Sequence, residues 1–288
     1  MSTVIHAGTV LGEVKLKVSD LTRSIAFYTK VIGLQVLEET SSTASLTADG
    51  STPLVVLEHI PDAIIPPRRS VTGLYHFAIL LPTRKALGLA LRNLIQAGIH
   101  IGQADHLISE ALYITDPDLN GIEIYADRPR DTWKQDAEGN YVMATNPIDW
   151  DGLLAEAGDE SWTGLPAGTR IGHIHLHVGN LPDSQAFYCD LLGFEVVGNY
   201  ANMGALFISA GGYHHHIGMN LWAGPGAAAA PANSTGLAYY TITVPDKTAL
   251  QALISRLKDA GHIITVQNDA HTVKDPWGIE IRLLCTAS

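Results

Sequence analysis

"SDLTRSIAFYTKVIGLQV" (19–36) and "GNLPDSQAFYCDLLGFEV" (179–196) are two copies of one pattern, and this repeat decides the fold. Each copy has a leucine, then a serine, then Ala-Phe-Tyr, and ends in a glycine turn that leads into strand-like residues. Such a pattern is typical of a helix that is followed by a tight turn and a strand. A supersecondary unit that recurs along a chain indicates a protein built from repeated modules.

A second pair of matching segments lies between and after the first. "GLYHFAILLPTRKALGLALRNLIQAGIHI" (73–101) aligns with "GLAYYTITVPDKTALQALISRLKDAGHII" (236–264). Each reads as an apolar strand, a turn and an amphipathic helix that ends in Ala-Gly. Gly98 and Gly261 are therefore predicted to take the left-handed conformation that closes a helix.

Together the repeats define four modules of one strand, one helix and two or three short strands. We place the modules near 9–59, 70–126, 170–222 and 234–284. The predicted division of the chain is 1–128 for modules one and two, 129–169 for a connector, and 170–288 for modules three and four. The fold class is therefore α+β, with βαβββ modules.

Composition limits the kinds of partner. The chain has 288 residues with a net charge of −11, 46% apolar residues and 16% charged residues. This acidity argues against binding to nucleic acid or to anionic membranes, both of which attract basic proteins. Two distant cysteines, Cys189 and Cys285, give no disulfide framework, and no signal peptide or membrane span is visible. We expect a compact cytoplasmic protein.

Histidines are concentrated in the stretch "GHIHLHV" (172–178). Alternation along a strand sends His173, His175 and His177 to one face. Three imidazoles on one face indicate a metal or proton-transfer site, or a polar cavity.

Four stretches carry a family resemblance: "VTGLYHFAILLP" (71–82), "DPDLNGIEIYADRPRDTW" (116–133), "IGHIHLHV" (171–178) and "GGYHHHIG" (211–218). With the modules, they resemble the vicinal oxygen chelate superfamily of glyoxalase I, bleomycin-resistance proteins and extradiol dioxygenases. The sequences of these stretches are most similar to those of four-module bacterial catechol-2,3-dioxygenases, which form one branch of the superfamily. The resemblance implies four βαβββ modules paired into two cup-shaped mixed sheets, with helices on the outer faces and a metal on one concave face.

In this superfamily the metal ligands come from the first strand of each module and from a last strand. The residues at first-strand positions are Glu13, His76, His173 and Tyr239. The last strands offer Glu123 in "GIEIY" and Glu280 in "GIEIR". Counted from the shared Asp-Pro, however, the residue equivalent to Glu123 is Arg282.

The ligand set depends on how the modules pair. Pairing module two with module three brings His76, His173 and Glu123 into one cup, a complete set of two histidines and one carboxylate. Modules one and four then form a cup without a first-strand histidine, which looks vestigial. Sequential pairing stays open, and in that arrangement Glu280 is the alternative ligand. We favour the first pairing.

The resemblance also implies three catalytic residues. Tyr113 precedes Glu123 by ten positions, and His106 lies slightly earlier; extradiol enzymes place a tyrosine and a histidine there to hold the substrate oxygens. His215 is the predicted acid–base catalyst, with His214 and His216 as alternatives. Alternation along a strand puts His215 on the face opposite to its two neighbours. His175 and His177 are expected to line the cavity rather than to bind the metal.

The predicted function is an extradiol dioxygenase that uses Fe(II), with Mn(II) as the alternative metal, and converts catechol and O2 to a 2-hydroxymuconic semialdehyde-type product. Two alternatives stay open: a glyoxalase-like metal-dependent lyase or isomerase, with a fourth ligand from 214–216, and a non-catalytic binding protein of the resistance type. We also expect a homo-oligomer.

Overall fold

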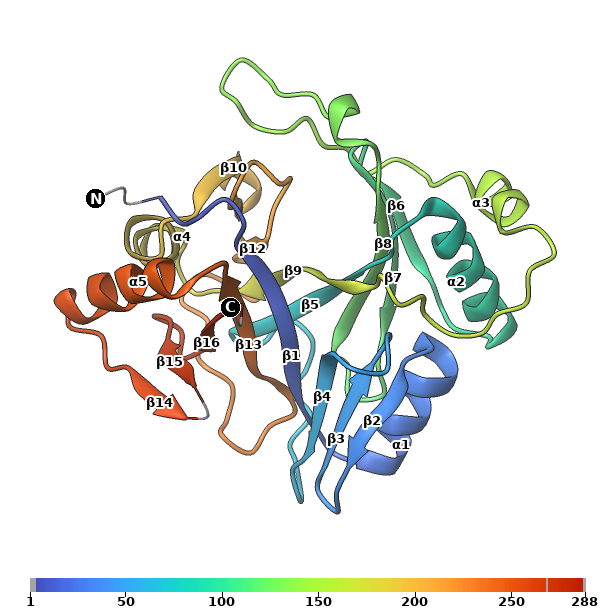
Figure 1. The fold of residues 1–288 in the computed structure, drawn as a ribbon, viewed down its shortest axis with the longest axis horizontal. Coiled ribbons are helices and arrows are strands. Elements are labelled where there is room, and N and C mark those ends of the chain that lie inside the picture. The colour runs from blue at the N-terminus through green and yellow to red at the C-terminus, as the bar shows by residue number, and fades with distance from the viewer. Residues whose placement is uncertain (1–3, 268, 287–288) are drawn as a thin grey trace.

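The protein forms two eight-stranded mixed sheets flanked by five α-helices, as seen in a computed structural model that describes residues 4–267 and 269–286 (Figure 1). Sheet one has the strand order β14-β15-β16-β13-β1-β4-β3-β2, and sheet two has the order β10-β11-β12-β9-β5-β8-β7-β6. The strands of sheet one are β1 Val10–Val18, β2 Gln35–Glu39, β3 Thr43–Thr47, β4 Pro53–His59, β13 Gly236–Val244, β14 Thr265–Gln267, β15 Ala270–Lys274 and β16 Glu280–Cys285. Those of sheet two are β5 Gly73–Leu80, β6 Gly102–Asp105, β7 Ser109–Thr115, β8 Gly121–Asp127, β9 Arg170–His177, β10 Glu195–Tyr200, β11 Ala205–Ser209 and β12 Ile217–Asn220.

The strand order confirms the favoured pairing of the modules. In sheet one, β1 of module one pairs with β13 of module four, and in sheet two β5 of module two pairs with β9 of module three. Both of these central pairs are antiparallel, whereas β1–β4 and β5–β8 are parallel. Each sheet therefore combines one module from each half of the chain. The division into two-module halves around a connector stays a prediction.

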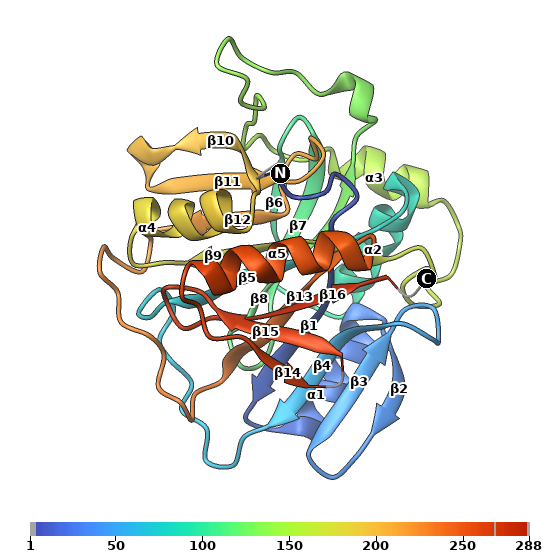
Figure 2. The same ribbon diagram turned by 60° about the vertical axis from the view of Figure 1, so that its left-hand side comes forward.

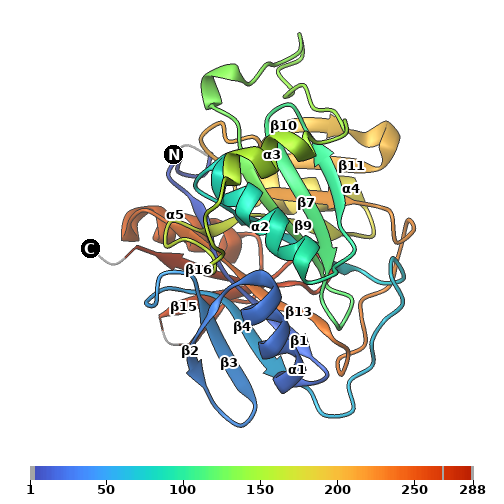
Figure 3. The ribbon, with the colours of Figure 1, turned by 90° about the vertical axis from the view of Figure 1, so that its right-hand side faces the viewer.

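One helix of each module lies outside its sheet, and a fifth belongs to the connector. The α-helices are α1 Leu21–Phe27, α2 Arg84–Gln96, α3 Trp150–Ala157, α4 Leu181–Gln185 and α5 Lys247–Asp259. Short π-helical turns, η1 Tyr28–Ile32 and η3 Ala186–Leu191, extend α1 and α4, and 3₁₀ turns form at η2 Arg130–Thr132 and η4 Ala201–Met203. Figure 3 shows α1 beside α2, and Figure 2 shows α4 beside α5, so each pair joins helices from the two sheets.

Local sequence signals fix where the helices begin and end. The side chains of Asp20, Thr83 and Asp246 each accept a hydrogen bond from a backbone N–H of the first turn, which satisfies a donor that has no partner inside the helix. The left-handed conformation predicted at the end of α2 and α5 is confirmed, with φ of 66° at Gly98 and 85° at Gly261. No helix in the described part of the chain is long and apolar enough to cross a membrane.

The repeated tyrosines join the two sheets. Tyr28, at the end of α1, donates a hydrogen bond to Asp116 in the turn before β8, over 3.0 Å. In the other half of the chain, Tyr188 donates to Asp275 in the turn before β16, also over 3.0 Å. Both tyrosines are fully buried. The Ala-Phe-Tyr motif of the repeat thus anchors a helix of one sheet to a turn of the other.

Asp275 predicts a pH dependence of stability. Burial raises its pKa from 3.8 to about 6, against the lowering effect of hydrogen bonds from Ile279, Trp277 and Tyr188. Because the folded pKa exceeds the unfolded one, the native state holds a proton that the unfolded state has released, so the free energy of unfolding falls as pH rises from about 4 to about 6. Asp275→Asn should remove this component, about 3 kcal/mol at most.

The test is urea unfolding of wild type and Asp275→Asn from pH 4 to pH 7. As pH rises across this window, the free energy of unfolding of the wild type should fall relative to that of the variant. A difference that is constant with pH would contradict the raised pKa.

Candidate metal centre

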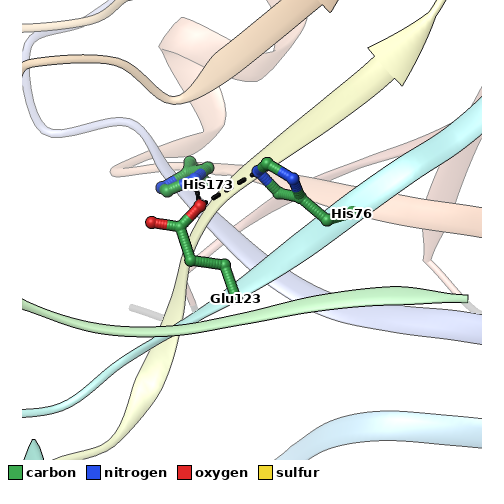
Figure 4. Close-up of side chains that lie close together, drawn as sticks. All are labelled: His76, Glu123 and His173. Atoms are coloured by element: carbon green, nitrogen blue, oxygen red, sulfur yellow. Dashed lines mark hydrogen bonds and ion pairs between the residues drawn. The ribbon is translucent and has the colours of Figure 1, made fainter. Parts of the chain in front are cut away.

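Three adjacent strands at the centre of sheet two carry the predicted ligands. His76 lies on β5, Glu123 on β8 and His173 on β9. Ala78 of β5 is the register partner of both Glu123 and His173. Because Ala78 has only a methyl side chain, the two longer side chains can meet above it. Figure 4 shows the three side chains pointing toward one another.

The ligand atoms form a compact buried cluster. Oε2 of Glu123 lies 3.0 Å from Nε2 of His173 and 3.1 Å from Nε2 of His76. One ligand atom of each residue lies within 4.8 Å of the other two, and all three residues are buried. The contact to His76 is close but does not have the alignment of a hydrogen bond, so this buried nitrogen has no hydrogen-bond partner. It is therefore free to bind a cation.

The charge state of the cluster suits a cation as well. Burial acts to raise the pKa of Glu123, but the neighbouring His173 and His76 outweigh it and hold that pKa well below the ordinary value. Burial lowers the pKa of His76 despite the opposing effect of Glu123. The lowered pKa favours the ionised form of Glu123, which is the form in which a carboxylate binds a metal. Two imidazole nitrogens and one carboxylate oxygen form the ligand set typical of non-haem Fe(II) oxygenases.

Tyr113 and His106 lie beside this cluster and contact each other. Tyr113 on β7 is the register partner of Glu123, and its ring lies 5.7 Å from that of His76. Nε2 of His106 is 2.7 Å from the Tyr113 hydroxyl, and its Nδ1 is 2.7 Å from the carbonyl oxygen of Ala144. Since a carbonyl only accepts, Nδ1 carries the proton and Nε2 accepts from the tyrosine. Burial, together with the charge of Glu123, raises the pKa of Tyr113 well above its ordinary value, which keeps the hydroxyl protonated.

The histidine triplet is not arranged as alternation predicted. Residues 213–216 form an irregular segment before β12, so strand alternation does not apply to them. His214 and His215 contact each other, with 2.8 Å between their Nδ1 atoms. His216 instead contacts Ser209, through its Nδ1. The expectation that His215 faces away from both neighbours is therefore wrong.

His215 is the member of the triplet nearest to the metal cluster. Its ring centroid lies 4.1 Å from that of His173, compared with 6.1 Å for His214. It is buried, and burial lowers its pKa well below the ordinary value. A neutral imidazole in this position can accept a proton.

His175 and His177 lie on the same face as His173, as alternation predicted, but outside the ligand cluster. Asn220 of β12 joins them: its amide nitrogen is 3.0 Å from His175 Nε2, and its oxygen is 2.6 Å from His177 Nδ1. Tyr75 packs against both rings at about the same separation, 5.1 and 5.0 Å. The pairing of β5 with β9 shifts register at Tyr75, and the Tyr75 ring also lies beside the ring of His76.

A cavity of about 460 Å³ borders the cluster. His76, Tyr113 and His177 line it, together with Arg69 from the loop before β5. A volume of this order suits a small ring-shaped ligand.

Sheet one has no comparable cluster in the described part of the chain. The Tyr239 hydroxyl donates to Glu13 over 2.6 Å, and Arg282 lies over the Tyr239 ring at 3.5 Å. Arg282 also contacts Glu280, with 3.4 Å between Nε and Oε1. The position equivalent to Glu123 thus carries a cation, and the acidic residues are paired with neighbouring side chains.

Comparison with known proteins agrees with the fold and the modules. The model of the glyoxalase/bleomycin resistance protein/dioxygenase superfamily matches residues 10–124 and 170–283, so the chain belongs to this superfamily. The chain is 58% identical over 274 residues to a catechol-2,3-dioxygenase of Bacillus subtilis (strain 168), covering 95% of this chain and 96% of that one.

Solved structures share the fold at low identity. Glyoxalase I of Zea mays superposes with a TM-score of 0.58 at 15% identity, covering 96% of this chain and 92% of that one. A crystal structure from Bacillus subtilis strain 168 gives a TM-score of 0.65 at 12% identity, covering 100% of this chain and 86% of that one.

Proposed function

We propose that this protein is an extradiol ring-cleaving dioxygenase in which His76, Glu123 and His173 bind Fe(II). The buried cluster of these three side chains carries the proposal, because it brings together the ligand set of a non-haem Fe(II) oxygenase. The relative that is 58% identical is named a catechol-2,3-dioxygenase, which supports catechol and O2 as substrates. Such a metal would supply Lewis acidity toward the two catechol oxygens and a route for electrons from the catechol to dioxygen.

The protein's own side chains then have distinct tasks. His215, beside His173, takes a proton from a catechol hydroxyl and returns it later in the reaction. His106 orients the Tyr113 hydroxyl by accepting its hydrogen bond, so the tyrosine oxygen can accept a hydrogen bond from a catechol hydroxyl. The ring opens beside the two hydroxyl groups and gives a 2-hydroxymuconic semialdehyde-type product.

The proposal also covers the partners, the cellular location and the oligomeric state of the enzyme. Its acidic composition, with net charge −11, supports action on a small aromatic molecule rather than on nucleic acid or at a membrane. We propose a cytoplasmic location and a homo-oligomeric state.

The experiment is anaerobic loading with Fe(II), addition of catechol, and admission of air while absorbance and dissolved O2 are followed. We expect a yellow product to appear as one O2 is consumed per catechol. Parallel loading with Mn(II) and measurement of bound metal distinguish the two ions. Iron-loaded protein that forms no yellow product would refute the proposal.

The two alternatives predict other outcomes. A glyoxalase-like enzyme would use a fourth ligand from 214–216, but the described ligand cluster contains none of these histidines. A binding protein of the resistance type has no need of a buried metal cluster. Binding of catechol without O2 uptake would favour the second alternative.

A further inference from the structure

Beyond the ligands and His215, a chain of hydrogen bonds leads from His215 to a carboxylate. Nδ1 of His215 is 2.8 Å from Nδ1 of His214, and Nε2 of His214 is 2.9 Å from Oδ1 of Asp127. Asp127 is the last residue of β8, on the strand that carries Glu123. We call Asp127, His214 and His215 the carboxylate–imidazole chain.

The donors in this chain follow from Asp127. An ionised carboxylate only accepts, so His214 carries its proton on Nε2. The Nδ1 of a neutral His214 then accepts, and His215 must donate from its own Nδ1. The proton of a neutral His215 is therefore on Nδ1, and Nε2 has the free electron pair. Among the described residues, the hydrogen bond of the His215 ring runs through its Nδ1, to His214.

Packing and hydrogen bonds hold Asp127 and His214 in place. His214 is only 1% exposed, and its ring contacts those of Tyr213, at 4.1 Å, and Trp133, at 5.2 Å. Asp127 also accepts a hydrogen bond from the Tyr213 hydroxyl over 3.0 Å, and Tyr213 in turn contacts the Tyr125 hydroxyl at 2.6 Å. His214 therefore has little freedom to turn its Nδ1 away from His215.

We propose that Asp127 and His214 are positioning residues, which hold His215 with its Nδ1 protonated and its Nε2 free to accept a proton from the substrate. This inference rests on the proposed function. In the step concerned, the O–H bond of a catechol hydroxyl breaks and an N–H bond forms at Nε2. The Nδ1 proton stays in its hydrogen bond to His214. Asp127 does not contact the substrate; it acts through His214.

The test is a set of variants compared by kcat, KM and iron content. In Asp127→Asn the amide nitrogen can donate to His214, which reverses the donors along the chain and leaves the proton of His215 on Nε2. We expect kcat to fall about 10- to 100-fold, while KM changes less than about twofold and iron content is unchanged. His214→Phe retains the aromatic packing without the hydrogen bonds and should lower kcat to a similar extent. This second variant also tests the proposal if Asp127→Asn does not fold.

A double-mutant cycle distinguishes positioning from a general structural effect. In a His215→Gln background, Asp127→Asn should produce no further loss, because its only route to the reaction is through His215. Asp275→Asn, which alters a different carboxylate that accepts a hydrogen bond from a tyrosine, should leave kcat at the wild-type level. Full kcat in both Asp127→Asn and His214→Phe would overturn the inference, and so would an equal loss with and without His215. If the wild-type protein does not cleave the ring, the proposed function itself is refuted. That result comes from the wild-type sample alone and is separate from the comparison of the variants.

Discussion

Glu123→Ala should lose nearly all of its iron and, with it, its ring-cleaving activity. Removing the carboxylate leaves two imidazoles, which carry no negative charge to balance a divalent cation in a buried site. Because Glu123 is the only acidic member of the cluster, we expect iron affinity to fall more than about 100-fold, beyond the effect typical of residues that merely support a ligand. Iron bound per chain after anaerobic loading and desalting measures this directly.

The matched control is Glu280→Ala in sheet one. Glu280 occupies a similar "GIE" sequence but is paired with Arg282, so its loss should leave iron content and activity at the wild-type level. Loss of iron in Glu280→Ala with retention in Glu123→Ala would place the metal in the other sheet.

His215→Gln should lower kcat about 10²- to 10⁴-fold, the range typical of a lost general acid–base catalyst. The amide side chain retains a similar length and can still bond to His214, but it cannot accept a proton. His215 is not a member of the ligand cluster, so iron content should not change. The measurement is steady-state kinetics with catechol, together with metal analysis of the same samples.

His216→Gln is the control within the triplet. Its imidazole contacts Ser209 and the backbone N–H of Ala210, rather than another histidine of the triplet. The control should retain kcat within about threefold of wild type, since only one hydrogen-bonding group is altered. If His216→Gln loses more activity than His215→Gln, the proposed acid–base role belongs to His216.

The sequence predicts the modules and their pairing because both depend on patterns that survive in local sequence. The two "AFY" segments and the two Ala-Gly helix ends repeat at matching positions. The cross-pairing follows from chemistry: His76, His173 and Glu123 make a complete ligand set only if modules two and three share a sheet, as they do. The strand alternation of 172–178 likewise places the three histidines on one face.

Features that depend on irregular backbone could not be predicted. Alternation fails at 213–216, where the chain has no strand geometry to impose it, and at Tyr75, where a register shift places the ring beside His76. The hydrogen bond between Tyr28 and Asp116 joins residues far apart in sequence, which only the folded arrangement of helix and turn brings together.

Asp127 was open to prediction and was missed. The alternation that groups His173, His175 and His177 also groups Glu123, Tyr125 and Asp127 along β8. The Tyr125 ring does lie against His173, at 4.9 Å. A second carboxylate four residues after a proposed ligand was therefore a visible signal. The sequence alone does not show that His214 is the hydrogen-bond partner of Asp127, because His214 belongs to another module.

The most direct test is a crystal structure of the anaerobically iron-loaded protein, with anomalous diffraction measured at the iron absorption edge. We predict one iron peak per chain, bounded by Nε2 of His76, Nε2 of His173 and the carboxylate of Glu123 in sheet two. A peak between Glu13, Tyr239 and Glu280 in sheet one, or no peak in protein that cleaves catechol, would contradict the proposed site.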